Sequence, residues 1–153
     1  MWMLKRKLLF ISFFIILFIA VFHFFAIKNS WYWTYRWLDI PVHIVGGFWV
    51  SLTVLWVCLK IKHIDNIYGY KKKALFVVFF SVFFVAVSWE LFELVFKITS
   101  LDSVGYFRDS LSDIFNSVIG GIFAYYYFVK SKNSSNCLIE NVSYNLPIIF
   151  KHE

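Results

Sequence analysis

Charged residues are scarce in this chain of 153 residues, at 16% of the sequence. Hydrophobic residues make up 61% and aromatic residues 24%, which is more apolar surface than a soluble protein of this size can bury. The composition therefore excludes an ordinary soluble domain. It predicts long apolar segments that face lipid.

Cysteine is nearly absent too, since the chain contains Cys58 and Cys137 alone. They form no C-x-x-C pair and no Cys/His spacing typical of a zinc site. The sequence also lacks a glycine-rich phosphate loop, a G-x-S-x-G elbow and an H-E-x-x-H motif. We therefore expect neither a disulfide framework nor the chemistry of the common soluble hydrolases and nucleotide-binding proteins.

Four apolar runs are present, and each is long enough to cross a bilayer, which takes about 20 residues. They span residues 8–27, 38–61, 74–96 and 110–129. The sequence thus predicts an all-α polytopic membrane protein with a bundle of four transmembrane helices in residues 1–130. Residues 131–153 are predicted to form a loosely ordered cytoplasmic tail. No small-residue cleavage site follows the first run, so we expect that helix to be retained.

Basic residues are distributed unevenly between the two sides of this bundle. Eleven of the fifteen Lys and Arg residues fall on the side of both termini, and four on the other. By the positive-inside rule both ends are therefore cytoplasmic, in a multi-pass protein of the inner or plasma membrane. The net charge of +6 then reflects topology and contact with anionic headgroups, and no nucleic-acid binding is expected.

Ionisable residues converge near the outer ends of three predicted helices. Asp39 and His43 share one face of the second helix, and Glu90 and Glu93 share one face of the third. Asp113 lies at a similar depth on the fourth, roughly 6 Å from the helix end at 1.5 Å per residue. An acid at the centre of a membrane helix costs about 2.5–3.5 kcal/mol, so such groups turn away from lipid. The convergence predicts a polar pocket in the outer leaflet.

Acids outnumber cations in this predicted pocket. The acids are Asp39, Glu90, Glu93, Asp109 and Asp113, and the cations are Arg36, Lys97 and Arg108. A divalent metal ion would balance the excess, and carboxylates with imidazole suit magnesium, manganese, iron or zinc. The predicted metal ligands are Asp39, His43, Glu90, Glu93 and Asp113. The catalytic candidates among them are Glu90, Glu93 and His43, and the residues predicted to bind a phosphate-bearing substrate are Arg108, Arg36 and Asn116.

Each of these features also has a purely structural explanation. Asp39 and Asp109 can act as caps at helix N-termini, where an acid complements the helix dipole. His43, and His23 on the first helix, can be hydrogen-bonded packing residues. Arg108 can anchor its helix at the membrane interface. A polar network that only stabilises the bundle therefore stays open as an alternative.

Three motifs follow one another along the chain. They read Asp39-x3-His43-x2-Gly46, then Trp89-Glu90-x2-Glu93, then Arg108-Asp109-x3-Asp113-x2-Asn116-x3-Gly120. In this order and spacing, residues 39–121 resemble the VanZ-like and YjdF-like families of small bacterial membrane proteins. The chain departs from the VanZ-like pattern at Ile40, where those proteins tend to carry Lys, and at Glu93, where they favour Gln. Within the motifs, Gly46-Gly47 and Gly120-Gly121 are predicted to allow close packing of helices.

The resemblance implies a role in the cell envelope, since some VanZ-like proteins are associated with resistance to the glycopeptide antibiotic teicoplanin. Our first hypothesis is that the outer pocket acts on or binds a lipid or lipid-linked envelope component. The second is a non-catalytic envelope or antibiotic-resistance binding protein. A transporter is disfavoured, because no inverted repeat is visible and the acids stop in the outer half. The pattern leaves open whether a reaction is catalysed, and an assembly of several copies is compatible with it.

Overall fold

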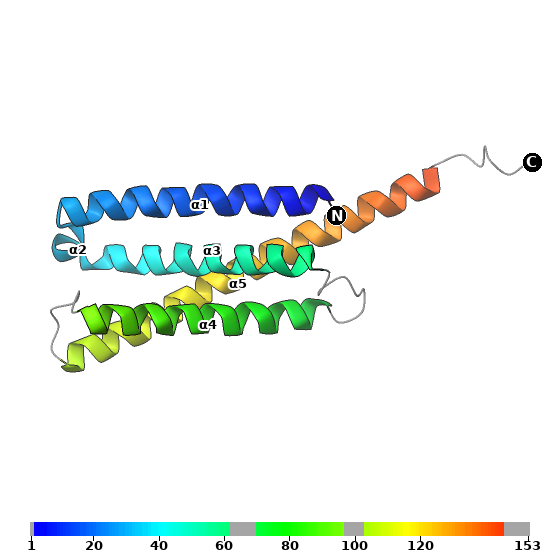
Figure 1. Cartoon of the computed structure of the whole chain (residues 1–153). Coiled ribbons are helices and arrows are strands. Elements are labelled where there is room, and N and C mark those ends of the chain that lie inside the picture. Colours follow the sequence, from blue (N-terminus) through cyan, green and yellow to red (C-terminus); the bar gives the residue numbers. More distant parts are fainter. Residues whose placement is uncertain (1, 62–69, 97–102, 146–153) are drawn as a thin grey trace, which may run out of the picture.

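The computed structural model describes residues 2–61, 70–96 and 103–145, and within these ranges all regular secondary structure is helical. In chain order the elements are α1 (Trp2–Lys28), the short α2 (Trp31–Thr34), the 3-10 helix η1 (Arg36–Leu38), α3 (Asp39–Lys60), α4 (Tyr70–Phe96) and α5 (Ser103–Asn145). Successive long helices run in opposite directions, and α5 crosses the others obliquely (Figure 1). The start of α3, the end of α4 and the start of α5 therefore meet at one end of the bundle.

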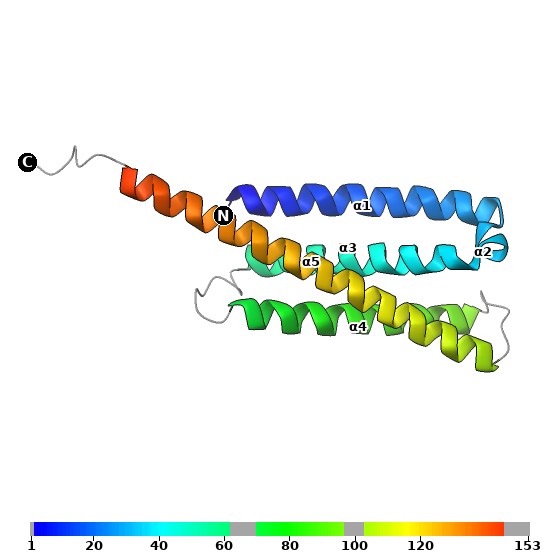
Figure 2. The same ribbon diagram turned by 180° about the vertical axis from the view of Figure 1, so that it is seen from behind.

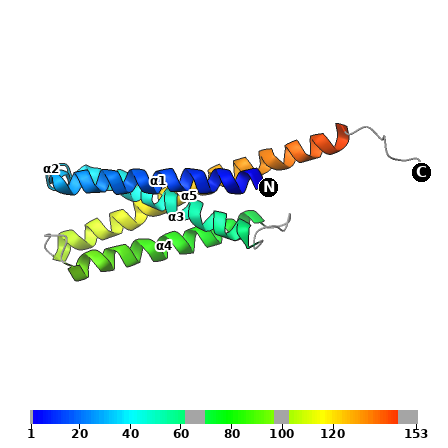
Figure 3. The ribbon, with the colours of Figure 1, turned by 45° about the horizontal axis from the view of Figure 1, so that its top comes forward.

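Helix α3 lies at the centre of the arrangement and contacts α1, α4 and α5. The view from behind shows α5 running across α3 and α4 (Figure 2). In the tilted view the start of α5 lies beside α4, and its far end extends past the start of α1 (Figure 3). Buried apolar side chains from all four long helices fill the space between them, among them Leu8, Leu55, Val82 and Phe128.

Large apolar side chains cover the outside of the bundle. Phe84 on α4 is 73% exposed and Phe10 on α1 is 66% exposed, and many aromatic neighbours are similar. Soluble monomers rarely expose this much continuous apolar surface to water, so these faces contact lipid. Helices α1, α3 and α4 are each long and apolar enough to cross a membrane.

The fourth long helix, α5, is not among these three. Asp109, Asp113 and Asn116 and a run of tyrosines make it more polar than the others. It nevertheless packs along α3 and α4, so its polar face is turned towards protein. The prediction of an all-α membrane bundle with four long helices is confirmed.

The helices extend beyond the apolar runs from which they were predicted. Helix α1 includes Lys5-Arg6-Lys7, α4 begins at Tyr70, and α5 begins at Ser103 instead of near residue 110. The predicted bounds mark where the helices would leave the hydrocarbon core of the membrane. Lys, Arg and Ser are compatible with a helix, so each helix can continue into the polar region beyond that point.

The segment after residue 130 also differs from its prediction. The sequence predicts a loosely ordered tail from residue 131, whereas α5 continues as a helix to Asn145. No Gly or Pro interrupts residues 131–145, and the first helix-breaking residue is Pro147. Residues 146–153 lie outside the described part of the chain.

Two glycines bring α3 and α5 into backbone contact. A Cβ placed at Gly47 would lie 1.9 Å from the carbonyl oxygen of Ser117, and one at Gly120 would lie 1.9 Å from that of Ile44. The predicted role of glycine in close packing therefore applies to these two positions. It does not apply to Gly46, where a Cβ would have nothing within 4 Å.

Candidate functional site

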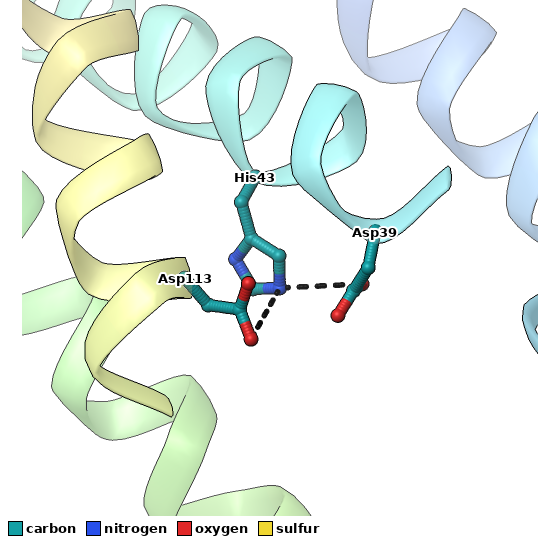
Figure 4. A group of neighbouring side chains, drawn as sticks. All are labelled: Asp39, His43 and Asp113. Carbon is teal, nitrogen blue, oxygen red and sulfur yellow. Dashed lines mark ion pairs between the residues drawn. The ribbon is translucent and has the colours of Figure 1, made fainter. Parts of the chain in front are cut away.

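Three ionisable side chains meet where α3 begins and α5 has completed its first turns. Asp39 and His43 come from α3 and Asp113 from α5, and one ligand atom from each lies within 4.8 Å of the other two. The Nε2 atom of His43 is 3.5 Å from Asp39 Oδ1 and 3.9 Å from Asp113 Oδ2 (Figure 4). We call these three residues the triad.

The other nitrogen of the His43 ring faces a hydroxyl group. Its Nδ1 lies 3.5 Å from Ser117 Oγ on α5. Two carboxylates around Nε2 require a positive charge or a proton between them, which either an imidazolium or a bound cation would supply. With the proton on Nδ1, the ring donates towards Ser117 and presents the lone pair of Nε2 to the carboxylates, an arrangement typical of metal-ligating histidines.

The distances in the triad are compatible with a common metal ion. Two ligand atoms that are each about 2.1 Å from one ion can be at most about 4.2 Å apart. The distances of 3.5 and 3.9 Å from His43 satisfy this limit, and the 4.8 Å that bounds the whole group exceeds it by less than 1 Å. Small side-chain rotations would therefore bring all three onto one ion. The Asp39 side chain is 36% exposed whereas those of His43 and Asp113 are 10% and 7% exposed, so access is from the Asp39 side.

Glu90 and Glu93 approach the triad from α4. Both lie close enough to His43 and Asp39 to interact electrostatically with them. Glu90 is buried, whereas the Glu93 carboxylate accepts a hydrogen bond of 2.7 Å from the indole of Trp89. The three helices that were predicted to form the pocket thus converge. Among the described residues, however, the group whose spacing suits a metal ion is the triad, and it contains neither glutamate.

The explanation that the two outer aspartates complement helix dipoles fits the position of Asp39, in the first turn of α3, but not that of Asp109. Asp39 is the first residue of α3, but the N-cap position is Leu38 and no side chain caps this end. Asp109 was predicted near the start of its helix, whereas α5 begins six residues earlier, at Ser103. Asp39 instead contacts His43, and Asp109 lies within electrostatic range of Glu90 and Asp113.

The residues predicted to bind substrate lie on α5 and in η1. Arg108 is exposed on α5, one residue before Asp109. Asn116 is buried and donates a hydrogen bond of 3.3 Å to Ser112 on the same helix. Arg36 lies in η1, but its side chain is outside the described part of the structure, as is all of Lys97.

Two polar side chains of α5 that the sequence analysis did not select line the same region. Tyr106 donates a hydrogen bond of 2.6 Å to the backbone carbonyl of Glu90. The Ser110 hydroxyl is buried beside the Glu90 carboxyl, without hydrogen-bonding geometry to any group of the described structure. With Asp113 and Ser117 they recur every three or four residues, which places them on one face of a helix. That spacing was the signal that could have identified them.

A second polar contact links α1 to the short helix α2. His23 Nδ1 lies 3.0 Å from the hydroxyl oxygen of Tyr32, and the His23 ring also packs edge-on against Trp89 at 6.5 Å. Burial and then the negative charges of Asp39 and Glu93 raise the pKa of Tyr32 from 10.0 to about 12. Tyr32 therefore stays protonated at neutral pH and forms a polar boundary of the site towards α1.

A family model described as "Predicted membrane protein (DUF2238)" matches residues 3–134. The match covers nearly all of α1, the whole of α3 and α4, and α5 as far as residue 134. No curated protein and no solved structure matches the chain. The resemblance to VanZ-like and YjdF-like proteins stays a prediction.

Proposed function

The chain belongs to the DUF2238 family of predicted membrane proteins, and we propose that it binds a divalent cation in the triad and, with it, a phosphate-bearing lipid or lipid-linked component of the cell envelope. The observation that carries this proposal is the approach of Asp39, His43 and Asp113 from two helices to within 4.8 Å. Polar groups placed this way in a membrane protein are functional-site candidates by default.

The envelope assignment rests on the order and spacing of the three motifs, which resemble those of VanZ-like and YjdF-like proteins. The location in the inner or plasma membrane, with the triad facing outwards, rests on the excess of basic residues at the opposite side. In this orientation a ligand reaches the triad from the outer leaflet, past the half-exposed Asp39 side chain.

In this proposal each group of the site has a separate task. The triad would hold the cation, which supplies charge to bind and polarise a phosphate oxygen. Arg108 is exposed on the same helix as Asp113 and would pair with the phosphate. Glu90 and Glu93 would act as general bases towards water or a hydroxyl group, with Trp89 orienting Glu93 through its hydrogen bond of 2.7 Å. The reaction class that this arrangement suits is hydrolysis or transfer at a phosphate-bearing headgroup.

Metal titration of the purified, chelator-treated protein tests the proposal. We expect one equivalent of Mn²⁺ or Zn²⁺ to bind, with affinity at least about 100-fold weaker in Asp113→Asn because a ligand is lost. Glu93→Gln is the matched control, since it removes a nearby negative charge without removing an atom of the triad. It should lose about tenfold or less. The absence of stoichiometric binding, or an equal loss in both variants, would refute the cation site.

A non-catalytic binding or resistance protein with a structural polar network is the second candidate. It is favoured by the fact that both ring nitrogens of His43 already have partners within the protein. In that case Asp113→Asn should lower the stability of the bundle, and metal titration of the unaltered protein should show no saturable binding.

A further inference from the structure

Most of the described lysines and arginines lie at the opposite end of the bundle from the acids near the triad. Among described residues up to 134, every acid belongs to the end that carries α2: Asp39, Glu90, Glu93, Asp109 and Asp113. The start of α1, the start of α4 and the later part of α5 meet at the other end (Figure 1), and all three carry lysines there. This basic end is remote from the triad, so a ligand bound at the basic end would be independent of the proposed function.

A surface hollow of about 430 Å³ lies on the first turns of α1 at this basic end. It is lined by Arg6, Lys7, Phe10 and Ile11. Two cations therefore border an apolar floor. The same change from charged to apolar groups occurs in a membrane lipid, between its headgroup and its acyl chains.

The two cations are held by aromatic rings. The Arg6 guanidinium lies 4.6 Å from the centre of the Trp2 ring, and the Lys7 ammonium lies 5.5 Å from that of Tyr127 on α5. Within the described part of the chain no carboxylate forms an ion pair with Arg6 or Lys7. A ring positions a cation without neutralising its charge, which leaves both charges available to an anion.

The apolar floor continues along α1 towards the middle of the bundle. Phe10 is 66% exposed and Phe14, one turn further, is 50% exposed, with 4.6 Å between their ring centres. Successive turns of a helix are about 5.4 Å apart, so the two rings form a strip of apolar surface that leads away from the cations. A ligand that suits the whole surface has an anionic head and a long apolar chain.

We propose that this hollow is a binding site for an anionic phospholipid of the leaflet at the basic end, with its phosphate between Arg6 and Lys7 and an acyl chain along Phe10 and Phe14. The charge complementarity and the apolar strip together favour a lipid over a soluble phosphate, which would leave the strip unused.

Native mass spectrometry of the purified full chain, titrated with dioleoylphosphatidylglycerol or dioleoylphosphatidylcholine, tests this site. We expect a tightly retained phosphatidylglycerol and weaker phosphatidylcholine binding. The double variant Arg6→Gln/Lys7→Gln should weaken phosphatidylglycerol binding by about 30-fold, since each surface cation contributes roughly a fivefold preference for anionic lipid. Lys7→Arg, which keeps the charge, should retain binding, and circular dichroism checks that each variant is folded.

The matched control is Lys71→Gln/Lys72→Gln, which removes two exposed charges from the same end on α4, outside the hollow. This variant should keep most of the affinity. Equal losses in the two double variants would show general surface attraction and overturn the site, as would equal binding of the two lipids. Displacement of the bound lipid by glycerol 3-phosphate would identify a soluble phosphate as the ligand and overturn the lipid assignment.

Discussion

Replacing Gly47 with alanine should push α3 away from α5, because the new Cβ would lie 1.9 Å from the carbonyl oxygen of Ser117. The carbonyl carbon and alpha carbon of Ser117 would also be within 2.8 Å. All three atoms belong to the backbone of α5, so no side chain can rotate to relieve the contact. The helices themselves must move.

The size of the movement sets the expected cost. Ordinary contact begins at 3.4 Å, so the two backbones must separate by about 1.5 Å, the difference between that distance and 1.9 Å. Overpacking that forces backbone shifts costs about 1–3 kcal/mol, and we expect Gly47→Ala to lose about 3 kcal/mol. The same separation would draw His43 on α3 away from Asp113 on α5, whose 3.9 Å approach leaves little margin for a shared cation.

Reversible unfolding of the detergent-solubilised protein measures the loss, and metal titration of the same samples measures the effect on the triad. Gly46→Ala is the matched control, because a Cβ there meets nothing within 4 Å and alanine favours the helix. It should be as stable as the unaltered protein or slightly more so. Equal stabilities for Gly46→Ala and Gly47→Ala would refute the close contact between α3 and α5.

Three further substitutions test other contacts of the bundle. Tyr127→Phe should raise the stability by about 1 kcal/mol, because the buried Tyr127 hydroxyl has no partner in the described structure; lower stability in unfolding measurements would contradict this. Ser12→Ala should cost about 1 kcal/mol in the same measurement, since it removes the 2.6 Å hydrogen bond to Thr53 that joins α1 to α3; an unchanged stability would count against that bond. The phenolate absorbance that Tyr32→Phe removes should appear near pH 12, and Asp39→Asn should move it towards pH 10. A titration of Tyr32 near pH 10 would contradict its partly buried position beside Asp39 and Glu93. Because the pKa of Tyr32 is higher in the folded than in the unfolded protein, its contribution to stability is complete below pH 10 and is lost between about pH 10 and 12.

The sequence predicted how deep the residues of the candidate site lie in the membrane, but not how each helix is turned about its axis. Counting residues from each helix end brought Asp39, His43, Glu90, Glu93 and Asp113 to one level of the membrane, and the structure does gather them at one end of the bundle. Which of them face one another depends on how each helix is turned about its axis. That turn is set by packing, and it placed His43 between Asp39 and Asp113.

The partners of these residues were harder to foresee. Ser110 and Ser117 contribute single hydroxyl groups in a sequence that contains many serines, and only their spacing from Asp113 on the same helix distinguishes them. Gly46 and Gly47 are neighbours and look equivalent in the sequence, yet one faces open space and the other touches α5. Neighbouring residues on a helix point about 100° apart, so only the position of α5 distinguishes them.

The amino-acid sequence alone determined that this protein lies in a membrane and that it consists of long helices. Its long apolar runs must be helical to satisfy backbone hydrogen bonds within lipid, and their number specified the four long helices. The tertiary structure decided which side chains meet. Contacts between helices depend on how closely their backbones approach, and in this chain Gly47 and Gly120 permit the close approach of α3 and α5.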